Sequence, residues 1–97
     1  MSGGGVRVRF APDVVLQVID GEALVLKLGR ESVFWLNETG ARIAELLQQE
    51  ARLEAVIARV AEEYAVDPSA VALEVHTLVE RLEARQLVIV ERGEDRR

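Results

Sequence analysis

The chain has 97 residues, 49% of them hydrophobic, and its 12 basic and 17 acidic side chains give a net charge of −5. This length corresponds to one small domain. The acidic balance argues against nucleic acid as the main partner, because phosphate-binding surfaces rely on Lys and Arg. The lack of cysteine excludes disulfides and thiolate metal sites, and it is typical of the reducing cytoplasm, where we expect the protein to act.

Glycine-rich and charged segments flank the predicted domain. Residues 1–5, MSGGG, have neither the basic nor the apolar part of a signal peptide, and we expect a flexible N-terminus. Residues 91–97, ERGEDRR, are all charge and glycine and are expected to form a solvated tail. No apolar run approaches the roughly 20 residues that cross a bilayer. The sequence thus predicts a single domain over residues 6–90 and no membrane partner.

Apolar runs predict strands in the first third of the chain. Residues 6–10 alternate apolar side chains with arginine, a period of two that is typical of a half-buried strand. Two further runs, residues 14–19 and 22–28, are joined by an Asp-Gly dipeptide, which favours a type I′ hairpin turn. A second reversal leads into a fourth run at residues 32–36. The last three runs therefore predict a three-stranded antiparallel meander.

The remaining two thirds have apolar residues at helical spacing. Asn37 is a favourable N-cap for a first helix, and Asp67 with Pro68 marks the start of a third. The apolar positions predicted to face inward are Ile43, Leu46 and Leu47 in the first helix, Leu53, Val56, Ile57 and Val60 in the second, and Val71, Val75, Leu78, Val79 and Leu82 in the third. Tyr64 continues the apolar face of the second helix at its end and is predicted to be a core or edge aromatic. A short last strand is expected at residues 87–90. This order predicts an α+β fold, a three-stranded antiparallel sheet packed on three helices, similar to a winged helix-turn-helix.

Residues that could carry out catalysis or bind a metal are scarce. The single histidine, His76, has Glu80 four residues further on, but two ligands do not make a metal site. None of the three serines stands in a recognisable nucleophile–base pattern, and no phosphate-binding glycine loop is present. The sequence therefore predicts a protein that is not an enzyme and that uses no metal or cofactor.

The stretch ESVFWLNETG, residues 31–40, concentrates two of the four aromatic residues on one strand before a helix cap. Phe34 and Trp35 are expected on opposite faces, because side chains alternate along a strand. One of them can enter the core, while the other meets solvent, a loop or a partner. This strand ends the meander, so one of its edges is free unless the N-terminal strand covers it. A free edge can pair with an extended peptide as an added strand.

Two segments, VFWLNETGARIAELL and YAVDPSAVALEVHTLVERLEARQLV, resemble the PqqD-like family in the order and spacing of their residues. Its members are the small leader-binding domains, or RiPP recognition elements, of pathways that modify ribosomally made peptides. The resemblance covers about residues 13–90. The chain differs from the family pattern at Gln86, where members often carry glycine, and at residues 48–52, where the turn between the first two helices is usually glycine-rich. A separate chain of this length is most similar to the recognition proteins of lasso-peptide pathways, or to the peptide chaperone of pyrroloquinoline quinone synthesis.

The resemblance implies a non-catalytic adaptor that holds the leader segment of a precursor peptide while a leader peptidase and a cyclase process it. We expect the leader to add as an antiparallel strand along residues 31–36 and to be clamped by the third helix. The predicted peptide-binding residues are Glu31, Ser32, Val33, Phe34, Trp35, Leu36, Glu74, Val75, Leu78, Arg81 and Leu82. The protein is expected to be a monomer that binds no nucleic acid.

Two other functions remain open from the sequence. A winged-helix DNA-binding or regulatory protein would need basic residues on its reading helix, and the second helix offers only Arg52 and Arg59 against Glu54, Glu62 and Glu63. A structural subunit, or a partner of the toxin–antitoxin type, would bury the same surface in another protein.

Overall fold

The structure, a computed structural model, describes residues 5–93. Its elements are β1 (Val6–Phe10), β2 (Val14–Ile19), β3 (Glu22–Lys27), β4 (Val33–Leu36), α1 (Glu38–Gln49), α2 (Leu53–Tyr64), α3 (Pro68–Ala84) and β5 (Val88–Arg92). Residues 1–4 and 94–97, which hold most of the predicted flexible N-terminus and charged tail, lie outside the described residues. β5 extends to Arg92, so its last two residues belong to a strand and not to the tail in which the sequence analysis placed them.

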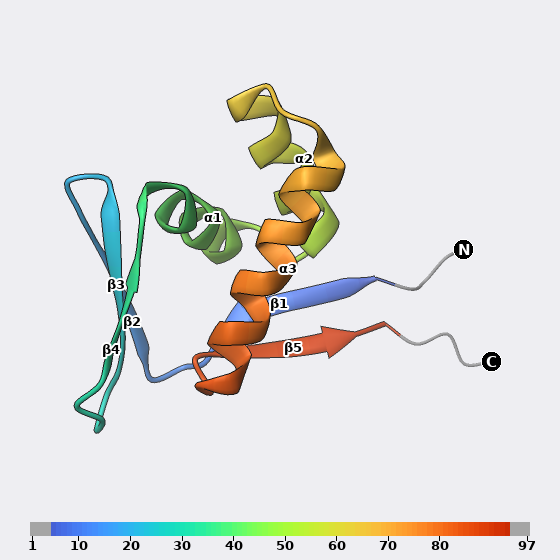
Figure 1. The fold of residues 1–97 in the computed structure, drawn as a ribbon. Helices are drawn as coiled ribbons and strands as arrows, with labels where there is room; N and C mark the ends of the chain where they lie inside the picture. The colour runs from blue at the N-terminus through green and yellow to red at the C-terminus, as the bar shows by residue number, and fades with distance from the viewer. Residues whose placement is uncertain (1–4, 94–97) are drawn as a thin grey trace.

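The predicted meander is present as an antiparallel sheet with the strand order β2-β3-β4 (Figure 1). Asp20 and Gly21 connect its first two strands with φ angles of 51° and 83°, the positive pair that a type I′ turn requires. The register pairs Leu16 with Val25 and Val25 with Phe34, which brings alternate apolar side chains to one face. α1 lies beside the sheet and covers this face (Figure 1).

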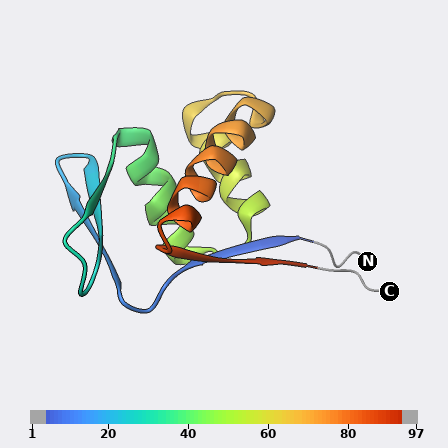
Figure 2. The ribbon, with the colours of Figure 1, turned by 60° about the horizontal axis from the view of Figure 1, so that its bottom comes forward.

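β1 forms a separate two-stranded ribbon. It pairs with β5 in antiparallel register, from Val6 opposite Arg92 to Phe10 opposite Val88. The ribbon points away from the three-stranded sheet, as Figures 1 and 2 show from two directions. A bond of 2.8 Å from the Val8 backbone N–H to the Ala51 carbonyl ties the ribbon to the connection between α1 and α2. Within residues 5–93, the N-terminal strand therefore leaves the outer edge of β4 uncovered.

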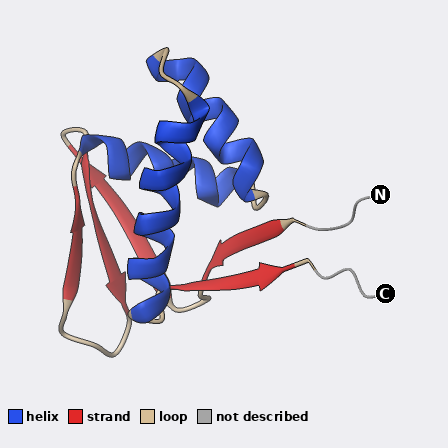
Figure 3. Cartoon of the chain, turned by 45° about the vertical axis from the view of Figure 1, so that its right-hand side comes forward, coloured by secondary structure: helices blue, strands red, loops and turns tan. Residues whose placement is uncertain are grey.

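The core lies where the inner face of the sheet meets the helices (Figure 3). All five core positions predicted for α3 are buried, as are the three predicted for α1. In α2, Leu53, Val56 and Val60 are buried, and Ile57 is partly buried and packs against the core. Of the two alternatives left open for Tyr64, core or edge, the structure shows the edge, because the side chain is exposed in the last turn of the helix. The three helices form a layer in which α1 faces the sheet and α2 packs on α3.

Both predicted N-caps are confirmed. The Asn37 side chain accepts a hydrogen bond of 2.9 Å from the Gly40 backbone N–H, and the Asp67 carboxylate accepts one of the same length from Ser69. The backbone bond from Ser69 lowers the pKa of Asp67, because it stabilises the ionised carboxylate. These caps hold the first turns of α1 and α3, which flank the site described below.

α2 and α3 end in the left-handed conformation without glycine. Ala65 has a φ of 54° and Gln86 a φ of 63°. After α3, Gln86 donates its N–H to the Glu83 carbonyl and Leu87 donates to Leu82, the pair of bonds of a Schellman motif. The departure from glycine at Gln86 thus leaves the cap geometry intact, with a side chain in a conformation that L-residues disfavour.

We expect Ala65→Gly to stabilise the protein by about 1 kcal/mol, because glycine adopts the left-handed conformation without a Cβ clash. Chemical denaturation of the two proteins measures this difference. The matched control is Ala58→Gly, an exposed position in the middle of α2, where the same change should destabilise by about 1 kcal/mol. Equal effects of the two changes would contradict the role assigned to Ala65.

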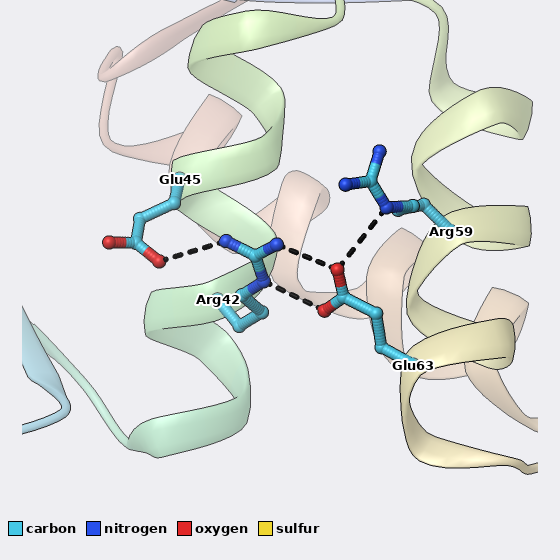
Figure 4. Close-up of polar contacts among 4 residues, drawn as sticks. All are labelled: Arg42, Glu45, Arg59 and Glu63. Carbon is cyan, nitrogen blue, oxygen red and sulfur yellow. Dashed lines mark hydrogen bonds and ion pairs between the residues drawn. The ribbon is translucent and has the colours of Figure 1, made fainter.

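A cluster of charged side chains joins α1 to α2 on the surface (Figure 4). Arg42 donates two hydrogen bonds to the Glu63 carboxylate, at 2.8 and 2.6 Å, and a third of 3.3 Å to Glu45. Arg59 lies 3.2 Å from the same Glu63 carboxylate. The hydrogen bond from Arg42 lowers the pKa of Glu63 below its usual value, because the ionised form is the one that accepts it.

Glu63→Gln should lower the melting temperature at neutral pH. Because the pKa of Glu63 is lowered in the folded state, its contribution is fully present above the ordinary value of 4.5 and is lost as the pH falls through the folded value. The difference in melting temperature between parent and variant should therefore shrink as the pH is lowered through the pKa of Glu63 in the folded protein. A difference that stays constant from neutral to acidic pH would contradict this assignment.

Candidate functional site

A groove of about 550 Å³ is bounded by the last strand of the sheet, the start of α1 and one face of α3. Its lining residues are Phe34, Trp35, Leu36, Asn37, Gly40, Ile43, Ala70, Leu73, Glu74, Thr77, Leu78 and Arg81. β4 is an outer strand of the sheet, and no strand of residues 5–93 pairs with its second edge. Backbone N–H and C=O groups on that edge are therefore open to a further strand.

The α3 side of the groove is a single stripe of the helix. The lining positions, from Ala70 to Arg81, repeat with the i, i+3, i+4, i+7 spacing of a helix, so they share one face. This stripe lies next to the core stripe and shares Leu78 with it, a residue that is only 8% exposed. Leu73, in contrast, is 72% exposed although it is a large apolar residue. α3 thus packs the core with one stripe and presents a second stripe to the groove.

The two aromatic residues of β4 lie on opposite faces, as their alternation predicts. Phe34 is 5% exposed and faces the helices, whereas Trp35 is 63% exposed. Trp35 pairs in register with Leu24 on the outer face of the sheet, which no helix covers. Of the two aromatic residues, Phe34 is therefore the one that enters the core, and Trp35 is the one that meets solvent.

Six of the eleven predicted site residues line the groove, namely Phe34, Trp35, Leu36, Glu74, Leu78 and Arg81. Val33 is the exposed first residue of β4 and lies just outside the lining. Glu31 and Ser32 are exposed, but they belong to the loop before β4. The strand predicted over residues 32–36 is therefore shortened to Val33–Leu36, and so is the segment 31–36 that was expected to pair with the leader. β3 ends at Lys27 and β4 pairs with it only from Val33 onward, which leaves no partner for these two residues.

Val75 and Leu82, which the sequence analysis also placed in the site, do not line the groove. Both side chains are 0% exposed and belong to the central core. They lie on the stripe of α3 that packs inward, so no residue of a bound peptide can reach them. The helical periodicity that places them in the core also explains their burial. Each follows a groove-lining residue, Glu74 or Arg81, in the sequence, but successive residues of a helix point in different directions.

Six lining residues were not predicted. Three come from the start of α1 (Asn37, Gly40 and Ile43) and three from α3 (Ala70, Leu73 and Thr77). The sequence carries a signal for Leu73, because it is a large apolar residue outside the core stripe of its helix. Gly40 allows a close approach: a Cβ there would lie 3.3 Å from both the Leu36 Cβ and the Asn37 Oδ1.

The chemical groups around the groove suit binding better than reaction. Among the described residues, no three potential metal-ligating side chains of the His, Cys, Asp or Glu type come together. His76 is exposed on α3 and belongs to no such group. None of the helices in residues 5–93 is long and apolar enough to cross a membrane. What the site offers is an open strand edge, apolar side chains from β4 and α3, and the charges of Glu74 and Arg81.

A family model agrees with this architecture. The model described as coenzyme PQQ synthesis protein D (PqqD) matches residues 22–88, which is more than half of the chain. The chain belongs to the PqqD family. The matched segment runs from the start of β3 to the start of β5 and contains every residue that lines the groove of this PqqD-family domain.

Two solved structures share the fold. One, described as TbiB1 in complex with the TbiA(beta) leader peptide, has a TM-score of 0.76 and 29% identity over 82% of this chain and 93% of that chain. The other, a lasso peptide synthetase B1 complexed with the leader peptide, has a TM-score of 0.75 and 20% identity over 86% of this chain and 98% of that chain. None of the curated proteins matches the sequence significantly. The predicted α+β fold and the predicted family are thus confirmed.

Proposed function

We propose that this PqqD-family domain is a non-catalytic adaptor that binds the leader segment of a ribosomally made precursor peptide on β4. The observation that carries the proposal is that the unpaired edge of β4 borders a groove whose opposite wall is α3. The two solved structures with this fold each hold a leader peptide, which supports the same use of the fold here.

The leader would lie antiparallel to β4 as a fourth strand of the sheet. Pairing with the open backbone groups supplies affinity that does not depend on the peptide sequence. Side chains of an added strand alternate, so every second residue would enter the groove between Phe34 and Leu78, next to Leu73. The residues between them would lie on the outer face, beside Trp35. Both sets of contacts can provide specificity.

The reactions of the pathway would belong to other proteins. We propose that a leader peptidase and a cyclase act in the cytoplasm on a precursor that this domain holds by its leader. Strand addition suits this division, because only the leader is bound and the rest of the precursor stays accessible. The family match also favours a second candidate, a peptide chaperone in pyrroloquinoline quinone synthesis. It would use the same groove and differ in the peptide that binds.

Titration with a labelled synthetic leader tests the proposal. The proposal predicts a short precursor gene beside the gene of this chain. The probe is the N-terminal half of that precursor, and a scrambled peptide of equal composition is the control. We expect saturable binding of the leader alone, and mass spectrometry should find the peptide unchanged after incubation with the protein. Failure of the leader to bind, or its cleavage by the pure protein, would contradict an adaptor role.

The DNA-binding interpretation makes the opposite prediction for the same protein. The two arginines that the second helix would offer to a basic reading surface, Arg52 and Arg59, are paired with Glu50 and Glu63. Together with the net charge of −5, this pairing leaves little to gain from the release of counterions at a phosphate backbone. A gel shift with a fixed footprint on duplex DNA would favour the winged-helix function over the adaptor.

A further inference from the structure

Three arginines lie around Phe34 and the C-terminal end of α3, and one of them, Arg81, lines the groove. The guanidinium carbons of Arg81 and Arg85 lie 5.1 and 5.0 Å from the centroid of the Phe34 ring. Arg30, in the loop before β4, donates a hydrogen bond of 2.6 Å to the side-chain oxygen of Gln86, just after α3. The basic end, as we name Arg30, Arg81 and Arg85, therefore joins the start of β4 to the C-terminal end of α3.

These three charges have no anionic partner among residues 5–93. No carboxylate of residues 5–93 forms an ion pair with any of them, and Arg7 is the one other basic side chain of that range without one. This is unexpected for a chain with 17 acidic residues and a net charge of −5. The Phe34 ring attracts two of the guanidinium groups through its π face, but it does not neutralise them. Like charges held together repel, and an incoming carboxylate would relieve that repulsion.

The opposite end of the α3 stripe has the opposite charge. Glu74 lies seven positions before Arg81, a distance of roughly 10 Å along a helix. About three residues of an extended peptide span the same length. The groove is therefore polar along its axis, acidic toward the N-terminal end of α3 and basic toward its C-terminal end.

We propose that the basic end binds an Asp or Glu side chain of the bound peptide and thereby sets the register of the peptide on β4. This inference rests on the proposed function and names a chemical feature of its ligand. Arg30 and Phe34 place the basic end at the start of β4. A peptide antiparallel to β4 reaches this point with its C-terminal side, so the acidic residue lies toward the C-terminal end of the bound segment.

The test uses the leader of the neighbouring precursor gene, acetylated and amidated so that only side chains carry charge. Each Asp or Glu is replaced in turn by Asn or Gln, and every peptide is titrated against the parent protein and the double variant Arg81→Gln, Arg85→Gln. For the parent, we expect one of these neutralised peptides to bind roughly 5-fold more weakly. The double variant should bind the unaltered leader as weakly as the parent binds that neutralised peptide. It should bind the unaltered and the neutralised peptide with equal affinity. Rising salt should narrow the difference seen with the parent.

Three further variants separate charge from packing. Arg85→Lys keeps the charge and should retain most of the affinity, because it is the charge that attracts the carboxylate. Arg59→Gln removes a charge from α2, outside the groove, and should bind both peptides like the parent. Arg30→Gln changes an exposed loop residue, so it reports on the basic end even if the double variant folds poorly, which its melting curve would show.

Equal binding of every neutralised peptide by the parent would overturn the inference while leader binding itself still stood. A leader that contains no acidic residue and binds tightly would overturn it as well. An unaltered leader that does not bind at all would overturn the proposed function, and the inference with it. The double variant could also bind both the unaltered and the neutralised peptides more weakly than the parent does. That result would show that the arginines act through packing over Phe34, and it would contradict the inference.

Discussion

Trp35→Ala is expected to weaken leader binding about thirtyfold without a loss of stability. The side chain is 63% exposed, so its removal leaves no cavity in the core. It stands on the strand edge that we propose to pair with the peptide, where a large aromatic residue is a typical binding hot spot. A hot spot commonly contributes about 2 kcal/mol or more, which corresponds to this loss of affinity. Titration of parent and variant with the labelled leader measures it.

The matched control is Tyr64→Ala, which removes another exposed aromatic side chain, at the end of α2 and outside the groove. It should bind the leader as the parent does. Both variants are compared only after their melting temperatures have been shown to equal that of the parent. If Tyr64→Ala weakened binding and Trp35→Ala did not, the leader would occupy another surface and the proposed site would be wrong.

Leu82→Ala is expected to destabilise the protein by about 2–5 kcal/mol, because it opens a cavity at a side chain that is 0% exposed. Protein that remains folded should bind the leader normally, since Leu82 does not reach the groove. Leu73→Ala should do the opposite: it should leave the stability nearly unchanged and weaken binding. Denaturant titration of each variant, followed by leader titration under folding conditions, separates the two effects.

Leu28→Ala provides the control for Leu73→Ala. Leu28 is also a largely exposed leucine, 64% against 72% for Leu73, but it lies in the loop after β3 and not in the groove lining. It should change neither quantity. The opposite result would be weak binding by the folded fraction of Leu82→Ala together with parent-like binding by Leu73→Ala. It would show that Leu82 contributes to leader binding and that Leu73 does not, which contradicts the groove face assigned to α3.

The burial of Phe34 explains how one residue can serve both the fold and the groove. Its ring belongs to the core and also lies about 5 Å from two guanidinium groups, at 5.1 and 5.0 Å from the ring centroid. Substitution of Phe34 would therefore disturb stability, groove shape and the basic end together. Trp35, Leu73 and the arginines are better positions for experiments, because each of them is exposed and can be changed separately.

Local features of this protein followed from the sequence by itself. The type I′ turn at Asp20-Gly21, the N-caps at Asn37 and Asp67 and the core stripe of α3 were all predicted and are confirmed. Each depends on residues only a few positions apart, because the local sequence determines turn φ angles, cap hydrogen bonds and helical periodicity. The resemblance to the PqqD-like family rested on the same patterns taken in order.

The tertiary structure decided what depends on residues far apart in the chain. Alternation placed Phe34 and Trp35 on opposite faces, but only the packing of α1 against the sheet determined which of them is buried. The pairing of β1 with β5, and not with β4, is what leaves the candidate edge open. The basic end likewise joins a loop to the end of a helix more than 50 residues further on. Such partners are chosen by the burial of apolar surface across the whole domain, a quantity that no local window of sequence contains.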